Sequence, residues 1–280
     1  MTWRIVADSS CDLTLCGLAT GEDVSFGTVP LKIVVGEEVF TDDASLDLLR
    51  LRKALADYPG RTSSACPSPA EWAQEFSKAD QIIAVTMTSA LSGTYNSALI
   101  ARDMMLEKEP GKKIHVIDTR STAGHMVLLC REISRLIDAG KSFEEVCEEA
   151  EKYNREKQLL FTLRSFDTLI KNGRMNKLTG ALASCLGMRA VGRATEKGEL
   201  GILHKTRGEA RAFSLFLQEM EKRGLREDAE IYLHHCRAET AAKLLYKLIL
   251  KKHPRCRVTV LPCRGLTGYY AGEGGILAAF

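Results

Sequence analysis

The strongest constraint on the fold is an alternation of short β-branched runs with amphipathic stretches over the first two-thirds of the chain. The runs at Arg4–Ala7, Gln81–Val85 and Lys113–Ile117 predict strands. Apolar residues about every three to four positions predict the helices, which are Ser45–Tyr58, Pro69–Lys78, Thr94–Lys108, His125–Ala139 and Phe143–Glu156. This alternation indicates βαβ units that form a largely parallel sheet.

A different element lies between the first two predicted strands. The runs Val29–Val35 and Glu38–Phe40 are joined by Gly36-Glu37, and this arrangement predicts a β-hairpin. We interpret the hairpin, about residues 29–40, as an insertion that decorates the sheet.

The pattern changes after Leu159–Phe161. Arg189–Ala194 and Leu200–His204 predict a second hairpin, and alternating helices and strands follow it at Gly208–Arg223, Glu230–His234, Glu239–Lys252 and Arg257–Val260. We therefore expect an α/β protein with two domains, residues 1–160 and 161–280. Since no Pro-, Gly- or Ser-rich linker separates the two parts, the cleft between them is the expected ligand site.

Composition excludes several classes of partner. The 39 basic and 36 acidic residues give a net charge of +3, so no broad basic surface is expected to bind nucleic acid or membranes. No uninterrupted apolar run reaches the roughly 18 residues of a membrane span, and the first residues lack the apolar stretch of a secretory signal. Nine cysteines without a CxxC pair are typical of reduced thiols, so we expect a cytoplasmic location.

The first hydroxyl-rich segment is Thr62–Pro69. We expect a polar loop in which Ser68 caps a helix that begins at Pro69. Two prolines would fix this loop and present the upstream hydroxyls, including that of Ser64. Helix capping alone is the simpler alternative.

The second hydroxyl-rich segment, Thr86–Ser97, follows a predicted strand and opens the next helix. This is the position at which α/β sheets bind ligands. The hydroxyls of Ser92 and Thr94, with the amide of Gly93 and the positive end of the helix dipole, would form a nest for a carboxylate or phosphate. The pattern leaves anion binding and simple capping both open.

A third candidate is Arg174, in the segment Leu169–Met175. The sequence predicts that a helix ends here with Gly173 at the left-handed cap position, so Arg174 directly follows the cap. An arginine in that position can clamp a carboxylate or phosphate. A solvated surface arginine is the alternative.

Two motifs that would indicate a specific catalytic chemistry are present only in part. Gly140–Ser142 resembles the end of a phosphate-binding P-loop, but Arg135 stands where that motif requires glycine. Ala90–Gly93 lacks the first glycine of a hydrolase elbow. Neither a nucleotide site nor a serine hydrolase is therefore predicted.

Two other polar groups are expected to be structural. His234 and His235 are neighbours on a predicted strand and point to opposite faces, so they cannot easily bind one metal ion, and we expect a core histidine with its hydrogen bonds satisfied. Turn or cap roles, instead of acid–base catalysis, are expected for Asp8, Asp12 and Asp42-Asp43.

Six short motifs, in order along the whole chain, resemble the DegV family. They are Val6–Leu13, Val29–Leu31, Ser64–Pro69, Leu91–Tyr95, Val116–Thr119 and Gly173-Arg174. None is diagnostic alone, but six in family order are specific. The resemblance implies an α/β amino-terminal domain with a parallel sheet and a second α/β domain with a mixed sheet.

The resemblance also implies a function. Family members bind fatty acids and are not themselves catalytic, and in some bacteria they present the lipid to a separate fatty acid kinase catalytic subunit, which phosphorylates the acyl carboxylate. The expected ligand is one long-chain fatty acid of about C16–C18, without a metal or cofactor. Burial of roughly fifteen methylenes at about 0.8 kcal/mol each would supply the affinity, before ordering costs.

Matching positions give the expected contacts of the ligand. The resemblance implies that Ser64 supplies a hydroxyl to the carboxylate and that Ser92, with the amides of Gly93 and Thr94, completes the cradle. Arg174 would lie near the head group or on a docking surface.

One position departs from the family pattern. The family typically has a histidine followed two residues later by Gly-Pro-Gly, whereas this chain has Tyr270 in the histidine's place and Glu273 in the proline's. Tyrosine can donate a hydrogen bond but cannot become a cation near neutral pH. Lipid binding tolerates this change more readily than the kinase role.

Two alternatives stay open. The hydroxyl cradle would also suit a stand-alone enzyme that acts on a small acyl phosphate, although the sequence offers no convincing general base near Ser92. A regulatory protein that senses lipid is the second alternative, and Tyr270 gives it mild support.

Overall fold

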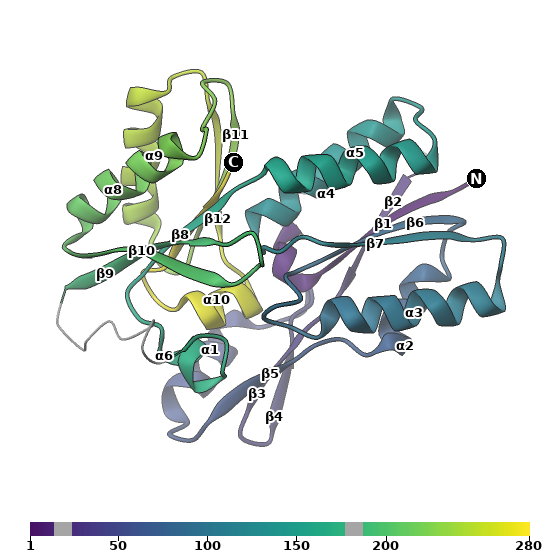
Figure 1. Cartoon of the computed structure of the whole chain (residues 1–280). Coiled ribbons are helices and arrows are strands. Elements are labelled where there is room, and N and C mark those ends of the chain that lie inside the picture. The colour runs from purple at the N-terminus through teal and green to yellow at the C-terminus, as the bar shows by residue number, and fades with distance from the viewer. Residues whose placement is uncertain (14–23, 177–186) are drawn as a thin grey trace.

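A parallel sheet forms the first half of the fold. The computed structural model describes residues 1–13, 24–176 and 187–280, and within them the strands form three sheets (Figure 1). The first sheet has the order β2-β1-β6-β7, with all neighbours parallel, and its strands are β1 (Trp3–Asp8), β2 (Val24–Val29), β6 (Gln81–Thr86) and β7 (Lys113–Asp118). The three strands predicted for this sheet are confirmed.

Helices cover both faces of this sheet. On one face lie α2 (Pro69–Phe76) and α3 (Thr94–Lys108), where Trp72 and Phe76 pack against β1 and β6. On the other lie α4 (Gly124–Asp138) and α5 (Phe143–Glu156). The predicted helices are confirmed, and α1 (Leu48–Asp57) begins later than expected because the Asp47 carboxylate caps its first turn.

The predicted first hairpin exists, but its surroundings differ from the expectation. β3 (Lys32–Val35) pairs antiparallel with β4 (Glu38–Thr41), whereas Val29 belongs to β2. Pro30 separates the two strands because it has no backbone N–H to donate. The expected loop at Thr62–Ala65 is also wrong, since these residues form β5 against β3, with the alternating exposure of a strand.

The second large sheet is mixed, as the resemblance implied. Its order is β10-β9-β8-β13-β11-β12; β11 and β12 are parallel and the other pairs antiparallel. Its strands are β8 (Leu159–Leu163), β9 (Met188–Ala194), β10 (Leu200–Arg207), β11 (Glu230–His235), β12 (Arg257–Pro262) and β13 (Ile276–Ala279). α8 (Glu209–Lys222) and α9 (Glu239–Lys252) pack on one face.

Three short helices complete the described fold: the 3-10 helix η1 (Ser9–Cys11), α6 (Asp167–Lys171) and α10 (Gly265–Ala271). The sequence did not predict η1, α10 or β13. β13 is buried at every position, so it has no alternation of apolar and polar residues to reveal it. The domain division between residues 160 and 161 stays a prediction; it falls within β8.

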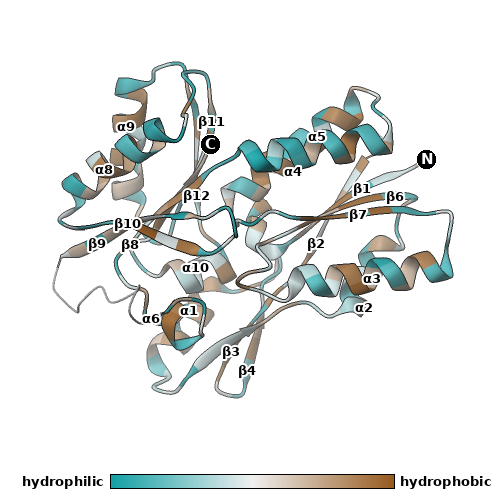
Figure 2. Ribbon diagram, in the orientation of Figure 1, coloured by the Kyte–Doolittle hydropathy of each residue, from teal (hydrophilic) through white to brown (hydrophobic). Residues whose placement is uncertain are grey.

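Helix α4 is shared by the two large sheets. It contacts β1 and β6 on one side and β11 and β13 on the other, and eleven of its fifteen residues are buried. Figure 2 shows brown, apolar residues in strands of both large sheets, and teal, polar residues that alternate with brown ones along the outer helices. A Cβ atom at Gly124 would lie 2.7 Å from the Cβ of Tyr232, so only glycine permits this close approach.

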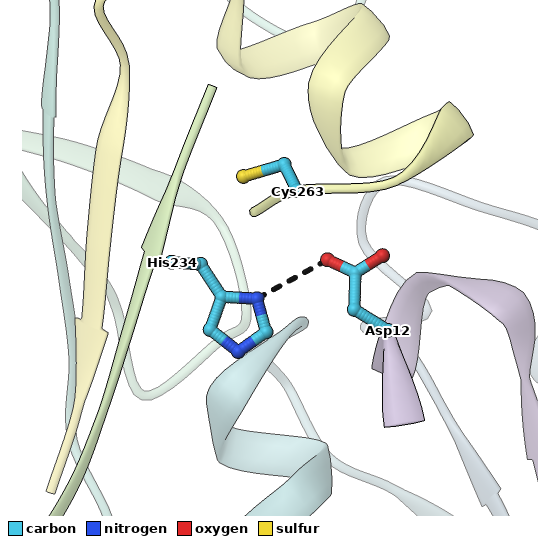
Figure 3. Close-up of side chains that lie close together, drawn as sticks. All are labelled: Asp12, His234 and Cys263. Atoms are coloured by element: carbon cyan, nitrogen blue, oxygen red, sulfur yellow. Dashed lines mark hydrogen bonds and ion pairs between the residues drawn. The ribbon is translucent and has the colours of Figure 1, made fainter. Parts of the chain in front are cut away.

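Polar contacts also join distant parts of the chain. His234 Nδ1 lies 3.2 Å from Asp12 Oδ2, with both side chains fully buried (Figure 3). The Asp42 carboxylate accepts the amides of Gly265 and Leu266 at the start of α10. The turn and cap contacts expected of the aspartates are present, but full satisfaction of His234 is wrong, because its Nε2 has no partner among the described residues.

Replacement of Gly124 tests the shared helix. We expect Gly124→Ala to lower the free energy of unfolding by about 1–3 kcal/mol, because the added methyl group overpacks the contact with β11. Urea denaturation measures the change. Gly111→Ala is the matched control, since a Cβ there meets nothing within 4 Å, and it should shift stability by less than about 0.5 kcal/mol. Equal effects of the two substitutions would contradict the close packing of α4.

Candidate functional site

An apolar cavity of ≈ 310 Å³ lies where the two large sheets face each other beside α10. Buried side chains form its inner wall; they include Met87, Leu159, Phe161, Leu163, Leu266 and Leu277. These residues come from the end of β6, from β8, from α10 and from β13. A cavity built from such side chains suits a hydrocarbon.

One end of the cavity is polar. Five of the six predicted site residues line it: Ser64, Ser92, Gly93, Arg174 and Tyr270. The Ser64 hydroxyl is 2.7 Å from that of Tyr270, and the Arg174 guanidinium lies 6.0 Å from the centre of the Tyr270 ring. β5, the loop before α3, the end of α6 and α10 therefore converge on one place.

Thr94 is the sixth predicted residue and does not line the cavity. It is fully buried, and its amide is 3.3 Å from the Ser92 hydroxyl, which accepts its hydrogen bond. The Thr94 hydroxyl has no partner among the described residues. In this structure the amide of Thr94 therefore holds the Ser92 hydroxyl in position.

Arg174 is held by backbone carbonyl groups. Its Nε donates to the carbonyl of Leu91 at 3.2 Å and its Nη1 to that of Asn172 at 2.6 Å. Gly173 has a φ of +74°, the left-handed conformation expected at this cap. No carboxylate pairs with Arg174 within the described parts of the chain, so its charge is available to an anion at the polar end of the cavity.

A tyrosine pair closes this end. The rings of Tyr269 and Tyr270 meet edge to face, with centroids 4.8 Å apart, and the Tyr269 hydroxyl contacts Thr62 and Asn172. Burial raises the pKa of Tyr270, while the hydrogen bond with Ser64 and the nearby Arg174 oppose that rise. Tyr270 is therefore a neutral phenol that can donate a hydrogen bond.

Sequence reasoning missed three hydroxyl residues that line the cavity: Ser10, Thr122 and Thr267. The Ser10 hydroxyl donates to Asp8 Oδ1 at 2.6 Å, and Asp8 Oδ2 accepts the amide of Met87 at 2.7 Å. Asp8 thus fixes two parts of the wall. The position of Ser10 directly after β1 was the available signal, because ligands bind at the carboxyl ends of parallel strands.

One buried group of residues has the composition of a metal site. Ligand atoms of Asp12, His234 and Cys263 lie within 4.8 Å of one another (Figure 3). Both Asp12 oxygens are already bonded, one facing His234 and the other accepting the amide of Arg264. Burial raises the pKa of Cys263 well above its ordinary value, which favours the thiol over the metal-binding thiolate. We assign this group a structural role.

The described cysteines are all free thiols: Cys11, Cys66, Cys130, Cys147, Cys236, Cys256 and Cys263. Cys16 and Cys185 lie outside the described residues. No helix within residues 1–13, 24–176 and 187–280 combines the length and apolarity that a membrane crossing requires.

The parallel sheet, the mixed sheet and the cavity between them define a class of α/β binding protein with one polar and one apolar end to its site. The family model described as "Uncharacterised protein, DegV family" matches residues 2–280. The chain belongs to the DegV family, and the resemblance inferred from its motifs is confirmed.

Relatives with similar sequence and structure cover the whole chain. A DegV domain-containing protein of Streptococcus gordonii is 39% identical and covers 100% of this chain and 99% of its own. The Fatty Acid Kinase (Fak) B3 protein of Streptococcus pneumoniae, solved with linoleic acid, matches with a TM-score of 0.96 at 40% sequence identity. The match covers 100% of this chain and 99% of that protein's chain. A DegV protein of Eubacterium eligens, loaded with heptadecanoic acid, has a TM-score of 0.92 at 33% identity, covering 99% of each chain.

The pH dependence of stability tests the environment of Asp8. Burial raises the pKa of Asp8 from 3.8 to about 6 in the folded protein. Between these values the folded state binds more protons than the unfolded state, so this group makes the free energy of unfolding fall as pH rises. Relative to Asp8→Asn, the wild type should lose on the order of 2–3 kcal/mol between about pH 4 and pH 6 and then level off.

Urea denaturation across this pH range measures the difference. The exposed Asp80 is the matched control, because hydrogen bonds with Thr2 lower its pKa, and so it is ionised in both states above about pH 5. The difference between the wild type and Asp80→Asn should stay constant over that part of the range. A constant difference for Asp8→Asn as well would contradict the raised pKa of Asp8.

Proposed function

We propose that this protein binds one long-chain fatty acid, with the carboxylate at the polar end of the cavity and the tail against its apolar wall. One observation carries the proposal: a single cavity joins several hydroxyls and an arginine, which pairs with no carboxylate among the described residues, to a wall of buried hydrocarbon. The fatty acids in the solved structures of Fak B3 and the Eubacterium eligens protein support it.

The contacts of the head group follow from the polar end. In this proposal, the hydroxyls of Ser64, Ser92 and Tyr270 donate to the carboxylate, and Arg174 supplies the compensating charge. Each methylene of the tail that leaves water contributes about 0.8 kcal/mol, so the apolar wall dominates affinity. The polar end fixes the orientation of the ligand.

The position of the polar end suits presentation of the head group to another protein. Ala65 and Gly93 line the cavity and are exposed, whereas Phe161 and Leu277 at the apolar wall are buried. A bound carboxylate would therefore lie near the surface while the tail stays covered. We propose that a separate kinase catalytic subunit is the partner and that this chain is a cytoplasmic carrier with no catalytic step of its own, its cysteines kept as free thiols.

A stand-alone enzyme has less support. The lining of the cavity contains no aspartate, glutamate, histidine or lysine within the described part of the chain. A hydrolase that used Ser92 as nucleophile would need such a group as general base within hydrogen-bonding distance. The cavity lining can therefore bind a carboxylate, but among the described residues it offers no general base to catalyse a reaction of the bound acid.

Substitution of Ser92 tests the carboxylate cradle. We expect Ser92→Ala to weaken fatty-acid binding by about 1.5–3 kcal/mol, because it removes one charge-assisted hydrogen bond. Titration of delipidated protein with a fluorescent fatty acid measures the dissociation constant. Ser97→Ala is the control, because Ser97 lies in the first turn of α3, close to Ser92 in the chain, and does not line the cavity. An unchanged dissociation constant for Ser92→Ala would remove Ser92 from the site.

The proposed function is tested directly by denaturing extraction of the purified protein followed by mass spectrometry. We expect about one fatty acid per chain, because a tail buried along the apolar wall should survive purification. Addition of a kinase catalytic subunit and ATP then tests presentation, with acyl phosphate as the product. The absence of lipid, even after incubation with mixed fatty acids, would reject the proposal.

A further inference from the structure

Alternate residues of β8 mark out the length of the apolar cavity. Leu159, Phe161 and Leu163 all line it, because every second side chain of a strand points to the same face. At about 3.3 Å per residue, Leu159 lies about 13 Å from Leu163 along the strand. The strand therefore provides a scale along which the position of a bound acyl chain can be judged.

The carboxyl end of β8 lies at the head-group end of the cavity. Leu163 is the last residue of the strand, and the chain continues from it into α6, which contributes Leu169 to the cavity and ends shortly before Arg174. β13 begins opposite the same end of β8, directly after α10, the helix that carries Tyr270. Leu159, at the amino end of the strand, is therefore remote from the carboxylate and faces the methyl end of the tail.

Leu159 stands in a row of smaller side chains that crosses the mixed sheet. The register of β8 with β13 places Ala279 opposite Leu159. On the other side, the antiparallel register of β8 with β9 brings Ala194 level with Leu159, and Leu200 of β10 pairs with Ala194. Leu159 is buried, whereas Leu200 is only half-buried. Leu159 is therefore the large buried side chain of this row.

A second cavity, of ≈ 270 Å³, lies beyond this row at the carboxyl end of β7. Leu159 lines both cavities, so its side chain separates them. Among the described residues, Leu159 and Ala194 are the only apolar ones that line the second cavity; the others are polar or charged, and include Asn154, Lys157 and Gln158. A methyl group that passed Leu159 would exchange a hydrocarbon wall for a polar one, which disfavours a longer tail.

The dimensions of the apolar cavity suit one acyl chain of the length found in membranes. Two such chains, end to end, form the roughly 30 Å hydrocarbon core of a bilayer, so one occupies about 15 Å. The span of about 13 Å between Leu163 and Leu159 is comparable. The volume of ≈ 310 Å³ is close to the lower limit of about 300 Å³ for ligand sites, so a longer tail has little space in which to fold back.

We propose that Leu159 determines the length of the fatty acid that this protein selects, by forming the end wall against the methyl end of the tail. This inference rests on the proposed function. A C16–C18 chain ends at Leu159, whereas a chain of C20 or longer has to displace this side chain or enter the polar second cavity. Removal of the side chain would join the two cavities into one longer channel.

Leu159→Ala tests the end wall. Delipidated protein is loaded with a fluorescent fatty acid, which saturated acids from C12 to C22 then displace. Each additional methylene that becomes buried strengthens binding about fourfold, so the affinity for the C20 acid relative to the C16 acid should rise at least about tenfold over the wild-type ratio. Leu163→Ala is the matched control, because it makes the same change on the same face of β8 at the head-group end. It should weaken binding of all the acids alike and leave the ratio within about twofold of the wild type.

Leu159→Phe makes the opposite prediction and does not remove atoms from the core. The larger ring extends into the cavity, so the tightest binding should move to an acid about two carbons shorter, and the C18 acid should bind about tenfold or more weakly. Circular dichroism verifies that each variant is folded, and Leu159→Phe decides the question if Leu159→Ala is not.

Three results would overturn the inference. The first is an unchanged preference for chain length in the folded Leu159 variants, and the second is an equal change of the ratio in Leu163→Ala. In both cases the protein still binds fatty acids, so the proposed function stands. The third is a wild type that binds no acid from C12 to C22, which would overturn the proposed function together with this inference.

Discussion

The structure depends on one buried helix that packs against two sheets at once. α4 contacts the parallel sheet and the mixed sheet, and the contact with β11 requires a glycine at its first position. Since the helix cannot be withdrawn from either sheet without exposing its apolar side chains, it sets the separation and angle of the sheets. The loop that leads into α4 contributes Thr122 to the apolar cavity, so the site depends on this junction.

Polar contacts between distant segments hold the cavity in shape. Asp8 joins η1 to the loop after β6, Asp42 caps α10, and Arg174 ties the end of α6 to the loop before α3. Each of these groups acts on backbone atoms, so the hydroxyls of the polar end are presented from fixed positions. A preformed cradle of this kind orients an anion with little loss of side-chain freedom on binding. The apolar wall opposite is buried among strands of the mixed sheet and can discriminate only by shape.

Local pattern predicted the regular elements well where periodicity was clear. α3 and α5 have the predicted bounds, and α2 begins at Pro69 as expected. In α2 and α5 a capping box and an amphipathic face act within a few residues, and in α2 a first-turn proline adds to them. The errors fall where burial or pairing overrides local pattern. Thr62–Ala65 was expected to be a loop but becomes β5 by pairing with β3, and β13 is a central strand without alternation. Val29 was assigned to the wrong strand because Pro30 marks a boundary that the apolar run conceals.

The sequence by itself determined the family, the α/β class, and the residue types at the polar end of the cavity. Ser64, Ser92, Gly93, Arg174 and Tyr270 come from segments far apart in the chain, and their motifs marked them individually. Only the tertiary structure decided that the Ser92 hydroxyl accepts the amide of Thr94 and that Ser10 lines the cavity. The physical reason is that hydrogen bonding and burial depend on which strands become neighbours. The pairing of β13 with β8, for example, joins residues that are more than a hundred positions apart in the chain, and no local sequence pattern can predict such a contact.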